Sequence, residues 1–262
     1  MAKFFPMFSS SSGNSTYIGD ATGGLLVDAG VSFKKISEKL AEKEISLSKI
    51  KAVLVTHEHG DHIKGLHTLL KKTGATVIAS RNTVYALEFH KAIEDGTPRI
   101  YIDECENLDF EGFTIKRFAT SHDCLDSSGY VITLSGGQRV AVCTDLGIVT
   151  DEVRGALCGL DLVMLESNHD PVMLRLGPYT PELKLRVAGE KGHLSNAVCA
   201  ELIGELFKNG TRRFVLAHLS ENNNTPEKAE SATRAALIDA GARENDYILY
   251  VAKPEGDRVM NI

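Results

Sequence analysis

The chain has 262 residues, of which 43% are hydrophobic and 24% charged, and its formal net charge is −6. This length supports a substantial core, so we expect residues 1–262 to form a single domain. The acidic balance disfavours a globally basic nucleic-acid-binding protein, although it leaves room for a local basic patch. No run of 18 apolar residues occurs, and five dispersed cysteines without a Cys-x-x-Cys motif favour a reducing compartment. We therefore expect a cytoplasmic protein without a membrane span.

Apolar runs and turn signals predict strands and helices that alternate along the chain. The expected strands are residues 24–28, 52–56, 76–79, 113–119, 129–134, 139–144, 162–166, 214–217 and 247–251. The expected helices are residues 32–43, 63–72, 83–93, 195–208 and 226–240. Thr225 and Pro226 are typical of a helix start, and Gly241 of its end. Paired strands with helices between them suggest two sheets with helices outside, an αββα sandwich of the α+β class.

Three histidines and two carboxylates are concentrated in the seven residues Thr56-His57-Glu58-His59-Gly60-Asp61-His62, directly after an apolar run. His57 and His59 are two residues apart, so on extended chain both side chains point the same way. Asp61 and His62 follow at once and can reach a second ion. Imidazole and carboxylate donors suit zinc, manganese or iron. Two ions about 3.5–4 Å apart need more ligands than this motif supplies, so the others must lie downstream.

Three downstream candidates each follow an apolar run that is typical of a strand. They are His122, Asp145 and His218. A single histidine at such a position more often packs in a core or a loop than binds a metal. The concentrated motif at residues 56–62 makes the ligand role the favoured interpretation for all three.

The order His-x-His-x-Asp-His at residues 57–62 resembles the signature of the metallo-β-lactamase superfamily. The resemblance implies a four-layer αββα sandwich and a hydrolase with two divalent metal ions, Zn²⁺, Mn²⁺ or Fe²⁺. It also implies the ligand sets. The first ion would be held by His57, His59 and His122, the second by Asp61, His62 and His218, with Asp145 bridging both. His59 stands where flavodiiron proteins carry Glu, and His62 is typical of binuclear phosphodiesterases, lactonases and thioesterases.

A second constellation consists of Glu166, at the end of an apolar run, and His193, just before a helix start. Their order is similar to that in the tRNA 3′-processing ribonuclease Z. This resemblance implies that His193 acts near the leaving group and that Glu166 orients it. A histidine held by a carboxylate suits general acid catalysis, because the carboxylate favours the imidazolium form. The alternative is a histidine that only packs at a helix entry.

An ordered set of short motifs resembles the YycJ (WalJ) family within this superfamily, from about residue 8 to residue 224. The motifs are residues 8–17, 25–30, 121–123, 129–130, 144–147, 166–170, 192–196 and 218–223. The resemblance implies a 5′-to-3′ exonuclease that acts on double-stranded DNA in the bacterial cytosol.

Five residues are candidates for contacts with such a substrate: Ser12, Asn14, Lys184, Ser195 and Asn196. The segment 9–14 offers hydroxyl and backbone N–H groups to a phosphate, although a tight turn between two strands explains it equally well. Ser195 also fits a helix cap, whose helix would itself favour an anion. A solvated charged loop is the default interpretation for Lys184.

These features predict a phosphodiesterase or nuclease in which hydroxide generated at two metal ions attacks phosphorus. Asp61 would be both ligand and proton acceptor, and His193 would protonate the leaving oxygen. The main alternative is a small ester, lactone or thioester hydrolase with the same metal pair and Tyr179 as oxyanion donor. A non-catalytic binding module is disfavoured, because it has no need of a complete ligand set. We expect a nucleic acid as substrate; no protein partner is indicated.

Overall fold

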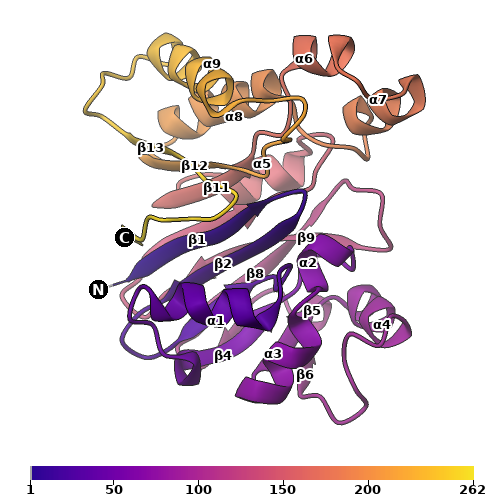
Figure 1. Cartoon of the computed structure of the whole chain (residues 1–262). Helices are drawn as coiled ribbons and strands as arrows, with labels where there is room; N and C mark the ends of the chain where they lie inside the picture. Colours follow the sequence, from indigo (N-terminus) through magenta and orange to yellow (C-terminus); the bar gives the residue numbers. More distant parts are fainter. Residues whose placement is uncertain (1) are drawn as a thin grey trace. The chain divides into compact units, whose positions relative to one another are not determined.

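The computed structural model describes residues 2–262, which divide into two compact units (Figure 1). The first unit comprises the chain up to Arg117 together with residues 124–138 and 253–262. The second comprises residues 118–123 and 139–252. The expectation of a single domain therefore stays a prediction. Within residues 2–262, no helix combines the length and the apolar character that crossing a membrane requires.

The strands form two seven-stranded sheets, and the first of these lies wholly in the first unit. Its strand order is β14-β1-β2-β3-β4-β5-β6. Strands β1 to β3 and β14 pair antiparallel, whereas β3 to β6 run parallel. Their bounds are β1 Lys3–Ser10, β2 Gly13–Gly19, β3 Gly24–Val27, β4 Ile50–Leu54, β5 Thr76–Ala79, β6 Arg99–Tyr101 and β14 Met260–Asn261. The mixed sheets confirm the expected α+β class.

Four helices of the first unit connect these strands: α1 Phe33–Ala41, α2 Gly60–Ile63, α3 Leu66–Thr73 and α4 Arg81–Phe89. Helices α1 and α3 bury Leu40 and Leu69 in the core that covers Val53 of the sheet. The prediction of a single helix over residues 63–72 is wrong at its start, because the helix is interrupted between α2 and α3. Gly65 lies at the break, and its N–H donates to the carbonyl oxygen of Ala29 at 2.8 Å instead of continuing a helix. A Cβ at this position would lie 2.0 Å from the carbonyl oxygen of Val31, so the close approach requires glycine.

The second unit is built on four parallel strands in the order β13-β12-β11-β10. Their bounds are β10 Arg139–Cys143, β11 Leu162–Glu166, β12 Arg213–Ala217 and β13 Ile248–Val251. The helices are α5 Asp151–Leu157, α6 Pro171–Leu176, α7 Pro181–Ala188, α8 Asn196–Lys208 and α9 Pro226–Asp239. The carboxyl ends of parallel strands meet at one edge of a sheet, which is where open α/β sheets bind ligands.

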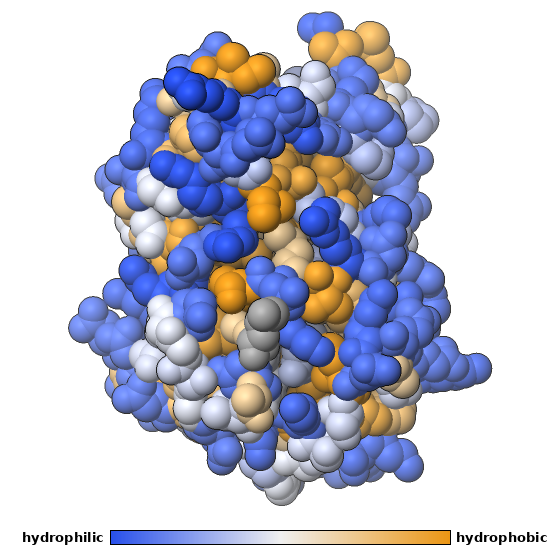
Figure 2. All heavy atoms as spheres, turned by 90° about the vertical axis from the view of Figure 1, so that its left-hand side faces the viewer, coloured by the Kyte–Doolittle hydropathy of each residue, from blue (hydrophilic) through white to orange (hydrophobic). Residues whose placement is uncertain are grey.

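The surface is mostly hydrophilic on the face drawn in Figure 2, with smaller hydrophobic areas between the polar ones. Several large apolar side chains are nevertheless exposed on the short helices α6 and α7, among them Val172, Leu176 and Leu185. Neither helix was predicted from the sequence. Lys184 lies on α7 and not in the charged loop that the sequence suggested. Thr180 caps this helix and Pro181 occupies its first position, a combination typical of a helix start.

Strand β9 (Ser127–Thr133) holds the segment that carries the histidine motif through two hydrogen bonds. Tyr130 of this strand is fully buried, and its hydroxyl donates a 2.6 Å hydrogen bond to the carbonyl oxygen of Val55. The backbone N–H of Ser128 donates to the carbonyl oxygen of Thr56 at 3.0 Å. Burial raises the pKa of Tyr130 far above its ordinary value, so the hydroxyl stays protonated and can donate.

Replacing Tyr130 by Phe should lower the free energy of unfolding by about 1–3 kcal/mol, because the buried carbonyl of Val55 loses its hydrogen bond from the hydroxyl. Urea unfolding followed by circular dichroism measures the change. Tyr85→Phe is the matched control, since Tyr85 is 64% exposed and should tolerate the same change. Equal stability of the two variants would show that the hydroxyl of Tyr130 contributes nothing.

Candidate metal-binding residues

The histidine motif of the first unit runs from the end of β4 into the short helix α2. The ring of His57 lies 4.6 Å from that of His59 and 4.1 Å from that of His62, measured between centroids. Oδ2 of Asp61 is 3.6 Å from Nε2 of His62. His57 and His62 are buried, whereas His59 and Asp61 are partly accessible. The structure therefore brings together all four ligand candidates that the motif supplies.

Asp28 holds this cluster in place, although the sequence did not mark it as a site residue. Its Oδ2 lies 2.7 Å from Nδ1 of His62, and both the N–H and the hydroxyl of Thr56 donate to the carboxylate at 2.8 Å. Burial raises the pKa of Asp28, and the bonds from His62 and Thr56 oppose that rise. The bond from Nδ1 of His62 to the carboxylate orients the ring with Nε2 toward Asn14 and Asp61. Histidine ligands of metals usually have their other ring nitrogen bonded in this way.

The N-terminal hairpin reaches the same cluster through Asn14. The side-chain amide of Asn14 lies 3.1 Å from Nε2 of His62 and donates to Oδ2 of Asp61 at 3.4 Å. Gly30 allows this approach, because a Cβ at that position would lie 1.7 Å from the carbonyl oxygen of Asp61. Ser12 is exposed in the turn between β1 and β2. Residues 11 and 12 form the tight turn between the two strands. The proposed contact of this segment with a phosphate stays a prediction.

In the second unit, Asp145 lies between two candidate histidines. Its Oδ1 is 3.9 Å from Nε2 of His122 and 3.6 Å from Nε2 of His218. The three side chains are almost completely buried. Nδ1 of His122 lies 3.1 Å from the carbonyl oxygen of Gly192, which orients this ring with Nε2 toward Asp145. Asp145 and the two histidines therefore form one buried cluster of possible metal ligands.

Glu166, at the end of β11, bonds two histidines through one oxygen. Its Oε1 is 2.8 Å from Nδ1 of His193 and 2.9 Å from Nδ1 of His218. Its Oε2 accepts backbone N–H bonds from Leu146 at 3.2 Å and from Leu194 at 2.9 Å. Burial alone would raise the pKa of Glu166, but the two histidines and these bonds hold it well below its usual range. The carboxylate is therefore ionised.

His193 and His218 differ in their access to solvent. The side chain of His193 is 18% exposed and that of His218 only 2%, and their rings stack with centroids 5.3 Å apart. Burial lowers the pKa of His193, but Glu166 more than compensates and raises it above the ordinary value. His193 is thus suited to carry a proton at an accessible position, and His218 to bind through Nε2.

Hydrogen bonds inside each unit orient the candidate ligands in a way that suits divalent metal ions. Three buried histidines, His62, His122 and His218, each have Nδ1 bonded to an oxygen, from Asp28, Gly192 and Glu166 respectively. A bond from Nδ1 to an oxygen fixes the tautomer, and in metal sites a histidine held in this way coordinates through Nε2. Candidate ligand atoms of Asp145, Glu166, His193 and His218 also lie within 4.8 Å of one another. Mixed nitrogen and oxygen donors suit zinc, manganese and iron.

Three of the predicted substrate contacts have local structural partners. The hydroxyl of Ser195 caps α8 by accepting from the N–H of Val198 at 3.3 Å. Asn196 is buried, and its Oδ1 accepts from the hydroxyl of Ser167 at 2.7 Å. Nζ of Lys184 donates to the carbonyl oxygen of Arg175 at 2.9 Å. Ser195 and Asn196 therefore fix the start of α8. The ammonium group of Lys184 provides a positive charge on α7.

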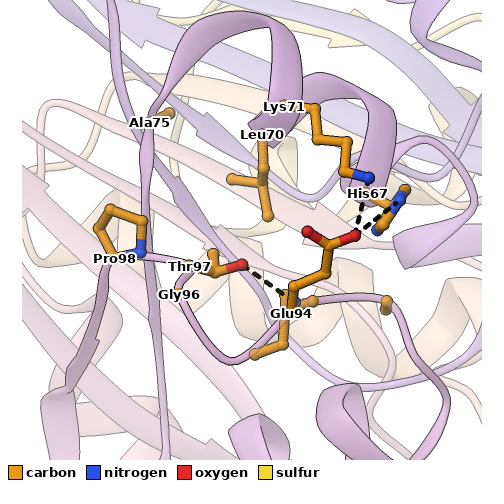
Figure 3. Close-up of a pocket in the computed structure, with 10 residues that line it drawn as sticks. His67, Leu70, Lys71, Ala75, Glu94, Gly96, Thr97 and Pro98 are labelled. Carbon is orange, nitrogen blue, oxygen red and sulfur yellow. Dashed lines mark hydrogen bonds and ion pairs between the residues drawn. The ribbon is translucent and has the colours of Figure 1, made fainter.

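A separate hollow, drawn in Figure 3, is lined by α3 and by residues 92–98. Its charges are already paired, because Glu94 lies 2.7 Å from Nζ of Lys71 and 3.7 Å from Nε2 of His67. It includes none of the predicted ligands. His67 is therefore a surface histidine of α3.

Comparison with known proteins gives consistent matches. Residues 24–219 match the family model described as "Beta-lactamase superfamily domain". The chain is 34% identical to Exodeoxyribonuclease YycJ of Bacillus anthracis over 91% of this chain and 90% of that protein. It is also 34% identical to Exodeoxyribonuclease WalJ of Streptococcus pneumoniae, over 97% and 95% of the two chains.

Among solved structures, the metallo-β-lactamase fold protein YhfI from Bacillus subtilis superposes with a TM-score of 0.72. That match has 16% identity and covers all of both chains, so it bears on the fold alone. It confirms the predicted metallo-β-lactamase fold. On the strength of the family model and of the two curated relatives, the chain belongs to the metallo-β-lactamase superfamily and, within it, to the family of YycJ and WalJ.

Proposed function

We propose that this metal-dependent hydrolase is a nuclease that cleaves DNA phosphodiester bonds with two divalent ions. The observation that carries the proposal is Glu166, which holds a solvent-accessible histidine, His193, and a buried ligand candidate, His218, through one oxygen. A proton donor is thereby coupled to metal ligands. The names of the relatives, both exodeoxyribonucleases, support DNA as the substrate. A 5′-to-3′ direction remains part of the proposal.

The proposed ligands are the seven residues that the sequence marked. They are His57, His59 and His122 for one ion, Asp61, His62 and His218 for the other, and Asp145 for both. The position of Asp145 between His122 and His218 supports the bridging role. When bound, two such ions would supply a nucleophile from water at neutral pH and stabilise charge on the phosphate oxygens.

His193 would donate a proton to the leaving oxygen of the phosphodiester. Its Nδ1 is bonded to Glu166, so Nε2 is the nitrogen available to the substrate. Glu166 also favours the imidazolium form that a general acid requires. Asp61 would accept the proton released by the attacking water. It is partly accessible, and the amide of Asn14 donates to its Oδ2.

The proposal is tested with end-labelled single- and double-stranded DNA and RNA, with Mn²⁺, Mg²⁺ or Zn²⁺ supplied to protein stripped of metal. Shortening of DNA from one end is expected only with added metal. His59→Ala should fold normally by circular dichroism and lose hydrolysis. A lactone and bis-p-nitrophenyl phosphate are assayed in parallel. Rapid lactone hydrolysis without DNA cleavage would favour the small-molecule hydrolase instead.

Replacing Asp28 by Asn should weaken metal binding by about 10–100-fold, because the amide no longer fixes Nδ1 of His62 as a donor. Competition with a chromophoric chelator measures the affinity. Asp95→Asn makes the same change of charge at an exposed residue and should leave the affinity unaltered. Unchanged affinity in the Asp28 variant would remove this residue from the support of the metal ligands.

Replacing His193 by Ala should reduce DNA hydrolysis by about 10²–10⁴-fold, the usual contribution of general acid catalysis. Hydrolysis of bis-p-nitrophenyl phosphate should fall much less, because p-nitrophenolate leaves without being protonated. His67→Ala, at a surface histidine, is the control. Equal losses on both substrates would contradict the acid role.

The same role predicts a pH dependence for the wild-type protein. Imidazolium is present below the pKa of His193 and is lost above it, and Glu166 raises that pKa. The rate of DNA hydrolysis should therefore fall as the pH rises through a value above the ordinary 6.5 of histidine. This alkaline limb should be absent from the residual activity of His193→Ala. A limb that persists in the variant would assign it to another group.

A further inference from the structure

A groove lies between α6 and α7, and the residues that line it follow Glu166 closely in the sequence. Its volume of about 460 Å³ falls within the range of roughly 300–1,000 Å³ that small-molecule sites occupy. The walls are mainly apolar and include Leu174 of α6 and Pro181 and Leu185 of α7. Leu185 is 74% exposed although it is a large apolar side chain. The nuclease chemistry described above uses no residue of this groove.

His169 lines the same groove and is only 4% exposed. Its Nδ1 has no hydrogen-bond partner among residues 2–262. Burial lowers the pKa of His169, so the ring is neutral. Buried polar atoms are nearly always hydrogen-bonded, to protein groups or to ordered water, so Nδ1 of His169 can accept a partner that is not part of the chain. A ligand with a polar edge would satisfy Nδ1 while its flat faces contact the apolar walls.

The backbone connects this groove to the residues proposed for catalysis. His169 is three residues after Glu166, so their Cα atoms are at most about 11 Å apart. Asn168, just before His169, donates its N–H to the carbonyl oxygen of Leu194 and its side-chain amide to that of His218, both at 2.9 Å. A substrate whose scissile bond lies at His193 can therefore extend into the groove.

Two cationic residues also line the groove. Arg175 and Lys184 face it from α6 and α7, and the bond from Nζ of Lys184 to the carbonyl oxygen of Arg175 joins the two helices. An apolar slot with a hydrogen-bonding group and cations matches a nucleotide of a polynucleotide. The base has apolar faces and a polar edge, and its backbone is anionic.

We propose that this groove binds one nucleobase of the nucleic-acid substrate, near the linkage that is cleaved, with Nδ1 of His169 as the hydrogen-bonding partner of the base edge. The proposal rests on the proposed function, because it names the part of a DNA substrate that the groove takes. It also gives α6 and α7 a role in substrate binding.

The test uses the metal-loaded, full-length protein and fluorescent single-stranded oligonucleotides with phosphorothioate linkages that resist hydrolysis. One oligonucleotide is intact, and each of the others has one abasic residue at a different position. Fluorescence anisotropy measures the dissociation constants. The wild-type protein should bind one of the abasic oligonucleotides about tenfold more weakly than the intact one, because stacking and base-edge contacts are lost there.

Leu185→Ser should abolish this tenfold difference, because the groove loses an apolar wall. Leu176→Ser is the matched control. It removes the same side chain at 75% exposure from the neighbouring helix, but outside the groove lining, and should keep the difference. Neither variant changes the charge of the protein, so electrostatic repulsion cannot imitate the result.

The proposal is overturned if the wild-type protein binds every abasic oligonucleotide like the intact one, or if Leu185→Ser retains the full difference. These results are separable from the nuclease assay. DNA cleavage without any abasic penalty would contradict the groove alone. A penalty that Leu185→Ser removes, in a protein that cleaves no DNA, would support the groove and contradict the proposed hydrolysis.

Discussion

A single carboxylate oxygen, Oε1 of Glu166, constrains the chemistry of the second unit. It bonds Nδ1 of both His193 and His218, while Oε2 accepts two backbone N–H groups. A buried ionised carboxylate carries a desolvation penalty of several kcal/mol, which these four hydrogen bonds offset. Because the two rings share one acceptor atom, a change of charge on His218 alters the bond to His193. Proton donor and proposed ligand are therefore electrostatically linked.

In both units, polar site residues stand just after a strand and have the same left-handed backbone conformation. Asp28 follows β3, Asp145 follows β10 by two residues and His218 follows β12, with φ angles of 61°, 58° and 54°. This left-handed conformation is uncommon for residues with a Cβ, although aspartate and histidine adopt it more readily than most. At each position this conformation follows the end of a strand, and the surrounding structure must hold the residue in it.

The site residues that could be predicted are those that their immediate sequence neighbours mark. The motif at residues 57–62 is contiguous, and His122, Asp145 and His218 each follow an apolar run, so their positions could be inferred. Asp28 follows the same kind of run, but the sequence does not show which side chain it contacts. Its role depends on a contact 34 residues away, with His62. Asp28, which orients a candidate ligand, was therefore harder to predict than the candidate itself.

Several strands and helices that the sequence did not predict can be explained in physical terms. Strands β1 and β2 contain buried serines and threonine, so they resemble a polar turn. Their hydroxyls are satisfied inside the sheet, as when Ser15 donates to the carbonyl oxygen of Asp28 at 2.8 Å. Helices α6 and α7 have six and eight residues, too few for a clear helical period. The roles proposed for the site residues remain predictions.

The pairing of β14 with β1 affects how the first unit can form. Phe4 lies opposite Met260, and Lys3 opposite Asn261, so the outermost ladder of this sheet joins the two ends of the described chain. Contacts at such separation in sequence require a large loss of chain entropy before they form, and they slow folding. Until they form, β1 presents an unpaired strand edge that can join another chain. Lys3 and Phe4 of β1 therefore lack this partner until residues 260 and 261 have been made.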